Sequence, residues 1–160
     1  FQLVATTTIK IKYYYNYMIV VNKLLLILIF PMLAFGQGDL QKIKEVLSKQ
    51  EAAWNQGDIY GFMLGYWQSD KLQFSSRDVT TYGWVNTYKK YQKNYPTNEK
   101  MGKLQFEIID LKLMSDTTAI VNGKWELIRK SSESLAGGFV LTFQKFNNDW
   151  LIIKDVTTSD

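Results

Sequence analysis

The sequence predicts an α+β domain in which N-terminal helices pack in a strongly curved antiparallel sheet. Residues 40–54, preceded by Asp39 as an N-cap, carry apolar side chains at helical spacing, whereas from Lys103 onward apolar and polar side chains alternate. The alternation changes phase by one residue at Ile108 and Ile109, a pattern typical of a β-bulge that bends its strand. The chain therefore begins its fold with helices and completes it with a bent sheet.

Three helices are expected before the long strands. The first should end at Gly57, since glycine suits the left-handed position just past a helix end. Asp58 suits the N-cap of a second helix, which should run from Ile59 to about Trp67. A third helix is expected over residues 84–95, because Pro96 disfavours helical backbone in the residue before it.

The strands are separated by polar turns and are long enough to form an extensive antiparallel sheet. They are expected at residues 71–75, 79–82, 103–113, 118–130, 139–143 and 150–157. In the last two strands both alternating sets are apolar, so both faces of the sheet need a cover. The helices cover one face only, and we therefore expect a homodimer through the outer face of the sheet.

The N-terminal part of the chain is typical of a targeting segment. Residues 1–17 have no assigned role and are interpreted as upstream sequence, and residues 18–36 are interpreted as a signal peptide. This segment has Lys23, an apolar run over residues 24–35 and small residues before Gln37, where cleavage is expected. A membrane anchor is the alternative, but the run is shorter than the roughly 20 apolar residues of a membrane span. We expect an exported protein, periplasmic or extracellular, without membrane association after cleavage.

Removal of this segment changes the charge balance. Lys10, Lys12 and Lys23 belong to it, which leaves 16 of the 19 basic residues against all 15 acidic ones. No cluster of basic residues remains that would follow a phosphate backbone, so no nucleic-acid partner is expected. The remaining 124 residues, 37–160, are the size of one domain with a single core.

Several short motifs occur in a specific order along residues 40–158. They are residues 50–58, Phe62-Met63 with Tyr66-Trp67, residues 81–84, Tyr95-Pro96, residues 101–106, residues 123–127, Gly138-Phe139 and residues 150–155. In this order they resemble the nuclear transport factor 2-like superfamily, and within it the exported bacterial proteins of unknown function of the SnoaL-like branch. The resemblance implies a cone-shaped fold, a curved sheet wrapped around helices. Relatives commonly close with Asp-His-Thr-Ser, whereas this chain has Asp155-Val156-Thr157-Thr158.

The absent residue types narrow the chemistry. The chain contains no histidine and no cysteine, which excludes a Ser-His-Asp triad, a thiolate nucleophile and an ordinary zinc site. No phosphate-binding, dinucleotide-binding or calcium-binding motif is present, so no cofactor and no metal are expected. Carboxylates, tyrosines, lysines and arginines remain for acid–base work.

Asp155 is the candidate catalytic residue. By simple alternation it shares a face of the last strand with Leu151 and Ile153, which places a carboxylate among apolar neighbours. Desolvation there would raise its pKa and suit it to act as a general base. The alternative is a structural carboxylate that is hydrogen-bonded to loop amides or paired with Arg77 or a lysine.

Aromatic side chains complete the candidate ligand site, at the mouth of the cone between the second and third helices and the concave sheet. The expected ligand-binding residues are Tyr66, Trp67, Tyr82, Trp84, Tyr88, Trp125 and Asp155. The alternative is that these rings form an ordinary core. Two functions follow from these residues. The first is non-catalytic binding of a small apolar or aromatic molecule; the second is a cofactor-independent enzyme of the isomerase or cyclase type with Asp155 as base.

Overall fold

A computed structural model describes residues 16–18, 37–130 and 132–160. The chain divides into two compact units, Phe1–Gly38 and Asp39–Asp160, and in the first unit residues 16–18 are helical. Most of the expected signal peptide lies outside the described residues, so the signal peptide and export stay predictions. Within the described part, none of the helices is long and apolar enough to cross a membrane.

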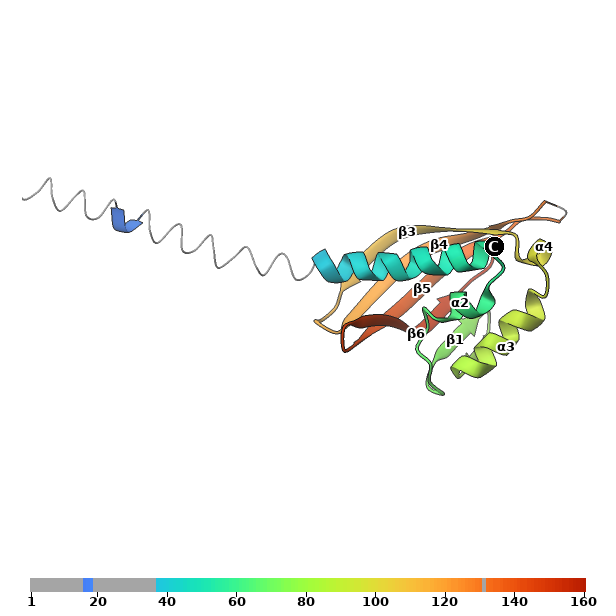
Figure 1. The fold of residues 1–160 in the computed structure, drawn as a ribbon, viewed down its shortest axis with the longest axis horizontal. Coiled ribbons are helices and arrows are strands. Elements are labelled where there is room, and N and C mark those ends of the chain that lie inside the picture. Colours follow the sequence, from blue (N-terminus) through green and yellow to red (C-terminus); the bar gives the residue numbers. More distant parts are fainter. Residues whose placement is uncertain (1–15, 19–36, 131) are drawn as a thin grey trace, which may run out of the picture. The chain divides into compact units, whose positions relative to one another are not determined.

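The second unit is an α+β fold of four helices and one six-stranded sheet (Figure 1). The helices are a long one at residues 37–55, α2 (Ile59–Met63), α3 (Trp84–Asn94) and α4 (Asn98–Met101). The strands are β1 (Gln73–Ser76), β2 (Val79–Tyr82), β3 (Lys103–Leu113), β4 (Thr118–Ile128), β5 (Leu135–Phe146) and β6 (Asp149–Thr157). The sheet order is β2-β1-β6-β5-β4-β3, with the β1–β6 pair parallel and the other pairs antiparallel. The predicted fold class is confirmed.

The long helix lies over one face of the sheet and forms the core with it (Figure 1). Ile43 and Leu47 from the helix are buried in the same cluster as Val121 of β4 and Phe143 of β5. Helix residues spaced four apart lie on one side, which explains why the apolar positions face the strands. Helix α3 contacts α2 and β2, whereas α4 lies at the start of β3 (Figure 1).

The connection between the first two helices is as predicted. Gly57 has a φ of 80°, and the Asp58 side chain caps α2 by accepting a hydrogen bond from the Gly61 amide at 2.8 Å. However, α2 ends at Met63 and not at Trp67. The backbone of the following residues pairs with β6 instead, since the Trp67 amide donates to the Ile152 carbonyl at 2.9 Å.

Two β-bulges bend the sheet. The predicted one is confirmed in β3, where Ile109 is the extra residue between pairs formed by Ile108 and Asp110. A second bulge, which the sequence did not indicate, makes Ile153 an extra residue in β6. It moves Asp155 to the buried face of the sheet, so the expectation that Asp155 shares the face of Ile153 was wrong.

The outer face of the sheet is covered in part by the chain itself. The Trp67 ring stacks on Phe146 of β5 with a centroid distance of 5.2 Å. This contact explains why one of the outward-facing residues of β5 is apolar. Val140 and Val156 are register partners on β5 and β6 and remain 43% and 38% exposed. The homodimer through this face stays a prediction.

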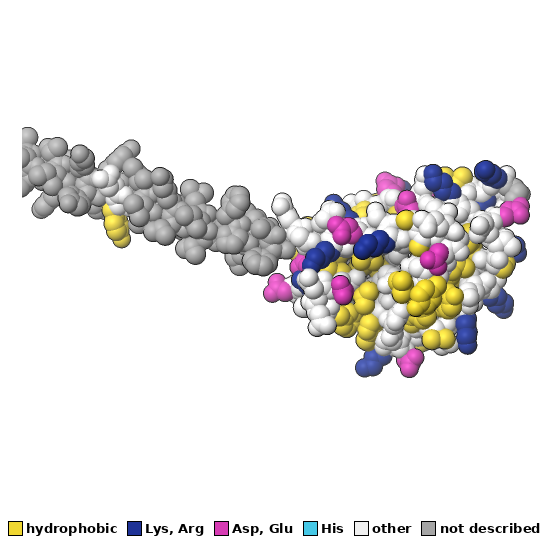
Figure 2. All heavy atoms as spheres, in the orientation of Figure 1, with side chains coloured by type: hydrophobic (Ala, Val, Ile, Leu, Met, Phe, Trp, Pro, Cys, Tyr) yellow, Lys and Arg dark blue, Asp and Glu magenta, His cyan; other side chains and the backbone are white. Residues whose placement is uncertain are grey.

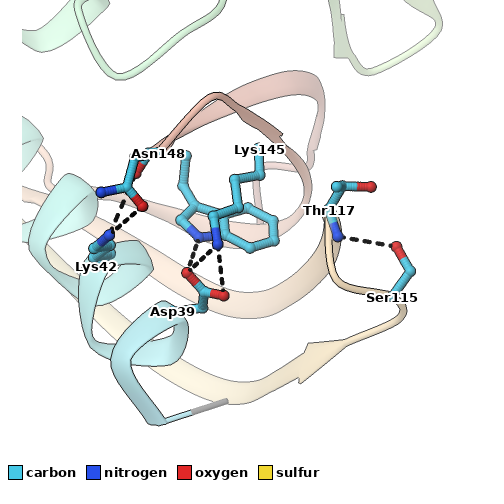
Figure 3. Close-up of polar contacts among 7 residues, drawn as sticks. Asp39, Lys42, Ser115, Thr117, Lys145 and Asn148 are labelled. Carbon is cyan, nitrogen blue, oxygen red and sulfur yellow. Dashed lines mark hydrogen bonds and ion pairs between the residues drawn. The ribbon is translucent and has the colours of Figure 1, made fainter. Parts of the chain in front are cut away.

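Asp39 anchors the long helix to the β5–β6 hairpin (Figure 3). It lies inside the helix, which begins at residue 37, so the prediction that it is the N-cap was wrong. Its carboxylate accepts hydrogen bonds from Lys145 Nζ at 2.9 Å and from Trp150 Nε1 at 3.0 Å. Burial alone would raise the pKa of Asp39, but these two hydrogen bonds and the nearby charges of Lys145 and Lys42 outweigh it and lower the pKa.

We expect Asp39→Ala to lower the free energy of unfolding by about 1–3 kcal/mol, because it leaves the buried Trp150 indole without its acceptor. The exposed Asp149, at the start of β6, offers a matched control, and Asp149→Ala should change stability by less than about 0.5 kcal/mol. Urea denaturation at neutral pH measures both. Equal losses in the two variants would contradict the anchoring role.

Candidate functional site

A cavity of about 570 Å³ lies between the helices and the buried face of the sheet. The long helix contributes Gln50 and Trp54 to its wall, and α3 contributes Tyr91. The sheet contributes side chains from all six strands, most of them apolar. A volume of this size lies within the range of about 300–1,000 Å³ found for small-molecule sites.

Three of the expected site residues line this cavity. They are Tyr66, Trp125 and Asp155. Tyr66 is placed there by its backbone bridge to Ile152 of β6, just after α2. Trp125 comes from β4, and Asp155 comes from β6 after the bulge. These positions are far apart in the sequence, and the fold brings them to one cavity.

The other four expected residues, Trp67, Tyr82, Trp84 and Tyr88, do not line the cavity. Trp67 lies beyond the shortened α2 and packs on the sheet. Tyr82 is 58% exposed on the edge strand β2. Trp84 and Tyr88 stack on each other at 5.4 Å on another side of α3, and Trp84 Nε1 donates to the Met63 carbonyl at 2.8 Å.

These outer rings belong to a surface region of their own. Figure 2 shows hydrophobic side chains gathered on the face that carries α2 and α3. Tyr60, Leu64 and Val85 are each about half exposed there. Tyr60 and Trp84 also border a shallow hollow that contains Asp70. This hollow is separate from the cavity that contains Asp155.

The centre of the cavity holds a hydrogen-bonded carboxyl–phenol pair. The Tyr66 hydroxyl donates to Asp155 Oδ2 at 2.7 Å, and both residues are buried. Within the described residues Asp155 Oδ1 has no hydrogen-bond partner, and neither Arg77 nor a lysine forms an ion pair with this carboxyl. The expected structural pairing with Arg77 or a lysine is therefore not observed.

Burial is the main electrostatic influence on this pair. Desolvation raises the pKa of Asp155 from 3.8 to about 7, although the hydrogen bond from Tyr66 opposes the rise. Burial also raises the pKa of Tyr66 well above its usual value, and the Asp155 charge adds to this. Tyr66 thus stays a neutral donor, while Asp155 exchanges its proton near neutral pH.

Tyr91 is a site residue that the sequence analysis placed on a helix but not in the cavity. Its pKa is raised by burial and by the charge of Asp155, whereas the Tyr66 hydroxyl lowers it. The residue lies three positions after Tyr88 and Gln92 lies four positions after it, and helical spacing suits either one to the buried face. The ring contacts of Tyr91 with Phe62 and Phe74 show that Tyr91 is the one that faces the core.

The mouth of the cavity differs from the one expected between the second and third helices. The exposed residues of the lining lie on the β1–β2 turn, on α3 and at the end of the described chain. They include Arg77, Asn94 and Asp160, and the half-buried Lys90 lies beside them. The mouth is therefore polar and the interior is apolar.

We expect Asp155→Asn to remove a pH dependence of stability. Because the folded state keeps this proton while the unfolded chain loses it, stability falls as pH rises from about 4 to about 7, by about 4 kcal/mol in total. Asparagine does not titrate and still offers an oxygen to Tyr66. The variant should thus be more stable than the native protein at about pH 8.

Denaturant unfolding across this pH window measures the effect, with Asp78→Asn in the exposed β1–β2 turn as the control. The control should retain the native slope of stability against pH. If Asp155→Asn retained it too, Asp155 would not carry the raised pKa.

Comparison with known proteins places the chain in a family. No protein-family model matches it, and no curated protein matches it. Among solved structures, an NTF2-like protein of unknown function from Shewanella oneidensis MR-1 is 37% identical, over 74% of this chain and 97% of that chain, with a TM-score of 0.71.

Two more distant structures share the fold. A ketosteroid isomerase-like protein from Erwinia carotovora atroseptica is 17% identical over 76% of this chain and 95% of its own, with a TM-score of 0.63. A nuclear transport factor 2 (NTF2-like) superfamily protein from Salmonella enterica serovar Typhimurium LT2 is 13% identical over 76% and 91%, with a TM-score of 0.60. On the identity and coverage of the Shewanella protein, this chain belongs to the NTF2-like family.

Proposed function

We propose that the protein binds a small, largely apolar molecule in the cavity and that Asp155 orients this molecule. The observation that carries the proposal is Asp155, which lines a cavity of about 570 Å³ and whose buried Oδ1 has no hydrogen-bond partner among the described residues. A buried acceptor without a hydrogen bond costs roughly 1–3 kcal/mol, so most such atoms are satisfied. A polar group of a bound molecule would satisfy this one.

The wall of the cavity supports an apolar or aromatic ligand. Phe74 and Trp125 present rings to it, and Leu127 and Leu141 present aliphatic side chains. Such a wall stabilises a ligand by removing apolar surface from water, at about 25 cal/mol per Å². The few polar groups then fix its orientation, as in most small-molecule sites.

Two further properties are proposed from the sequence. Export to the periplasm or the exterior rests on the character of residues 18–36. A homodimer rests on the exposed apolar pair Val140 and Val156 on the outer face. A dimer through these valines would leave the cavity accessible, because they lie on the opposite face of the sheet from Asp155.

We expect 2-naphthol, a flat apolar molecule with one hydroxyl, to bind the native protein and to lose at least about tenfold in affinity in Leu135→Trp. Leu135 is half-buried in the cavity wall, so the larger side chain would occupy the ligand's space. Val140→Trp, on the outer face of the same strand, is the matched control and should bind normally. Isothermal titration calorimetry measures all three, and the absence of binding to the native protein would refute the proposal.

Catalysis is the second candidate, and one observation favours it. The pKa of Asp155 is about 7, which leaves about half of the carboxyl groups ionised at neutral pH. Oδ1 could then accept a proton from a carbon next to a carbonyl group, while Tyr66 holds Oδ2 and the neutral hydroxyl of Tyr91 lies in the same cavity as a donor. The likeness to the ketosteroid isomerase-like structure shows the fold alone, because function depends on the site.

The catalytic candidate predicts that the native protein exchanges the α-protons of 2-tetralone with deuterium faster than buffer does. The rate should rise with pH and level off above about 7, since the ionised carboxylate is the base. Asp155→Asn should abolish the excess exchange and still bind 2-naphthol. Proton NMR in D₂O measures the rates, and exchange at the buffer rate would leave binding as the function.

A further inference from the structure

We infer that the ligand is an amphipathic organic acid, with its apolar body in the cavity and its carboxylate bound at the mouth by Lys90 and Arg77. The inference rests on the proposed binding function and names the chemical class of its ligand. It is carried by the charges at the mouth, which are independent of Asp155 in the interior.

Lys90 is held at the mouth by neutral groups. Its ammonium lies 5.0 Å from the centroid of the buried Phe74 ring and donates to Thr81 Oγ1 at 3.3 Å. Lys90 is half-buried, and among the described residues no carboxylate lies within ion-pair distance of it. A partly desolvated cation without a counter-ion favours an anionic ligand over a neutral one.

Arg77 adds a second cation to the lining of the mouth. It stands in the β1–β2 turn, lines the same cavity and forms no ion pair within the described part of the chain. Its planar guanidinium presents parallel donors that match the two oxygens of a carboxylate. Asp160 also lines the mouth, where its charge opposes an anion, so the side chains there sum to one positive charge.

The sheet register sets the length of the ligand. Phe74 of β1 is the register partner of Asp155, and Arg77 follows three residues later. At about 3.3 Å per residue along a strand, the Arg77 backbone lies about 10 Å along the sheet from the level of Asp155. The Lys90 ammonium, over the Phe74 ring, lies between these two ends. A body of two fused rings with a hydroxyl at one end and a carboxylate at the other has this length. The hydroxyl would donate to Asp155 Oδ1.

The test compares 6-hydroxy-2-naphthoic acid with its uncharged carboxamide, which has the same shape. At low salt and neutral pH, calorimetry should show the acid binding about five- to tenfold more tightly than the amide. The double variant Arg77→Gln, Lys90→Gln should remove this preference and keep the amide affinity within about twofold. Asp160→Asn should tighten the acid about two- to threefold, because it removes the opposing charge.

The control is Lys89→Gln with Lys93→Gln, which removes the same charge from α3 at positions outside the cavity wall. It should retain the preference for the acid. Equal binding of acid and amide by the native protein, or a preference that survives loss of Arg77 and Lys90, would overturn the acid class and leave the binding function standing. If neither probe binds, the acid class fails, and the 2-naphthol titration decides separately whether the binding function stands.

Discussion

The site depends on a single extra residue in β6. With regular alternation Asp155 would point to the outer face of the sheet, where water would solvate its carboxylate. The bulge at Ile153 reverses the alternation and places Asp155 beside Trp150 and Ile152 on the buried face. The same bulge leaves Val156 facing outward. The bend of the strand and the position of the carboxyl group thus have one cause.

The buried Asp155 destabilises the fold that positions it. Among the described residues its carboxyl accepts one hydrogen bond, from Tyr66 at 2.7 Å, and such a bond to a charged group contributes about 1.5–3 kcal/mol. A pKa shift from 3.8 to about 7 corresponds to about 4 kcal/mol against the ionised form, so desolvation exceeds what the tyrosine returns. The surrounding core of aromatic and aliphatic residues holds the group in place. This imbalance is typical of a group that is retained for binding or chemistry and not for stability.

The architecture could be predicted from the sequence because it rests on local signals. Gly57 and Asp58 mark a helix boundary through backbone conformation and capping, and the phase slip at Ile108 marks a bulge. The bulge at Ile153 had no such signal. Residues on both faces of β6 are apolar, so an extra residue does not change the alternation of apolar and polar side chains. For the same reason the sequence identified Asp155 as a buried carboxylate but assigned it to the wrong set of neighbours.

The aromatic residues of the site were harder to predict than the strands. Rings are equally suited to a core, a cavity wall and a surface cluster, so residue type did not separate Tyr91, which lies in the cavity, from Tyr88, which does not. The distinction depends on the rotation of α3, which is set by tertiary contacts such as that of Trp54 with Tyr91. The end of α2 depended likewise on backbone pairing with β6.

The departure from the closing motif of relatives has a specific structural meaning in this chain. The resemblance of the closing residues implies a histidine in relatives at position 156, and here the Val156 side chain lies on the outer face beside Val140. A histidine at this position, on this backbone, would point away from the cavity and would not reach the Asp155 carboxyl. The chemistry available inside the cone is therefore set by Asp155, Tyr66 and Tyr91, whichever side chain occupies position 156. Val156 instead adds, with Val140, to the exposed apolar surface of the outer face.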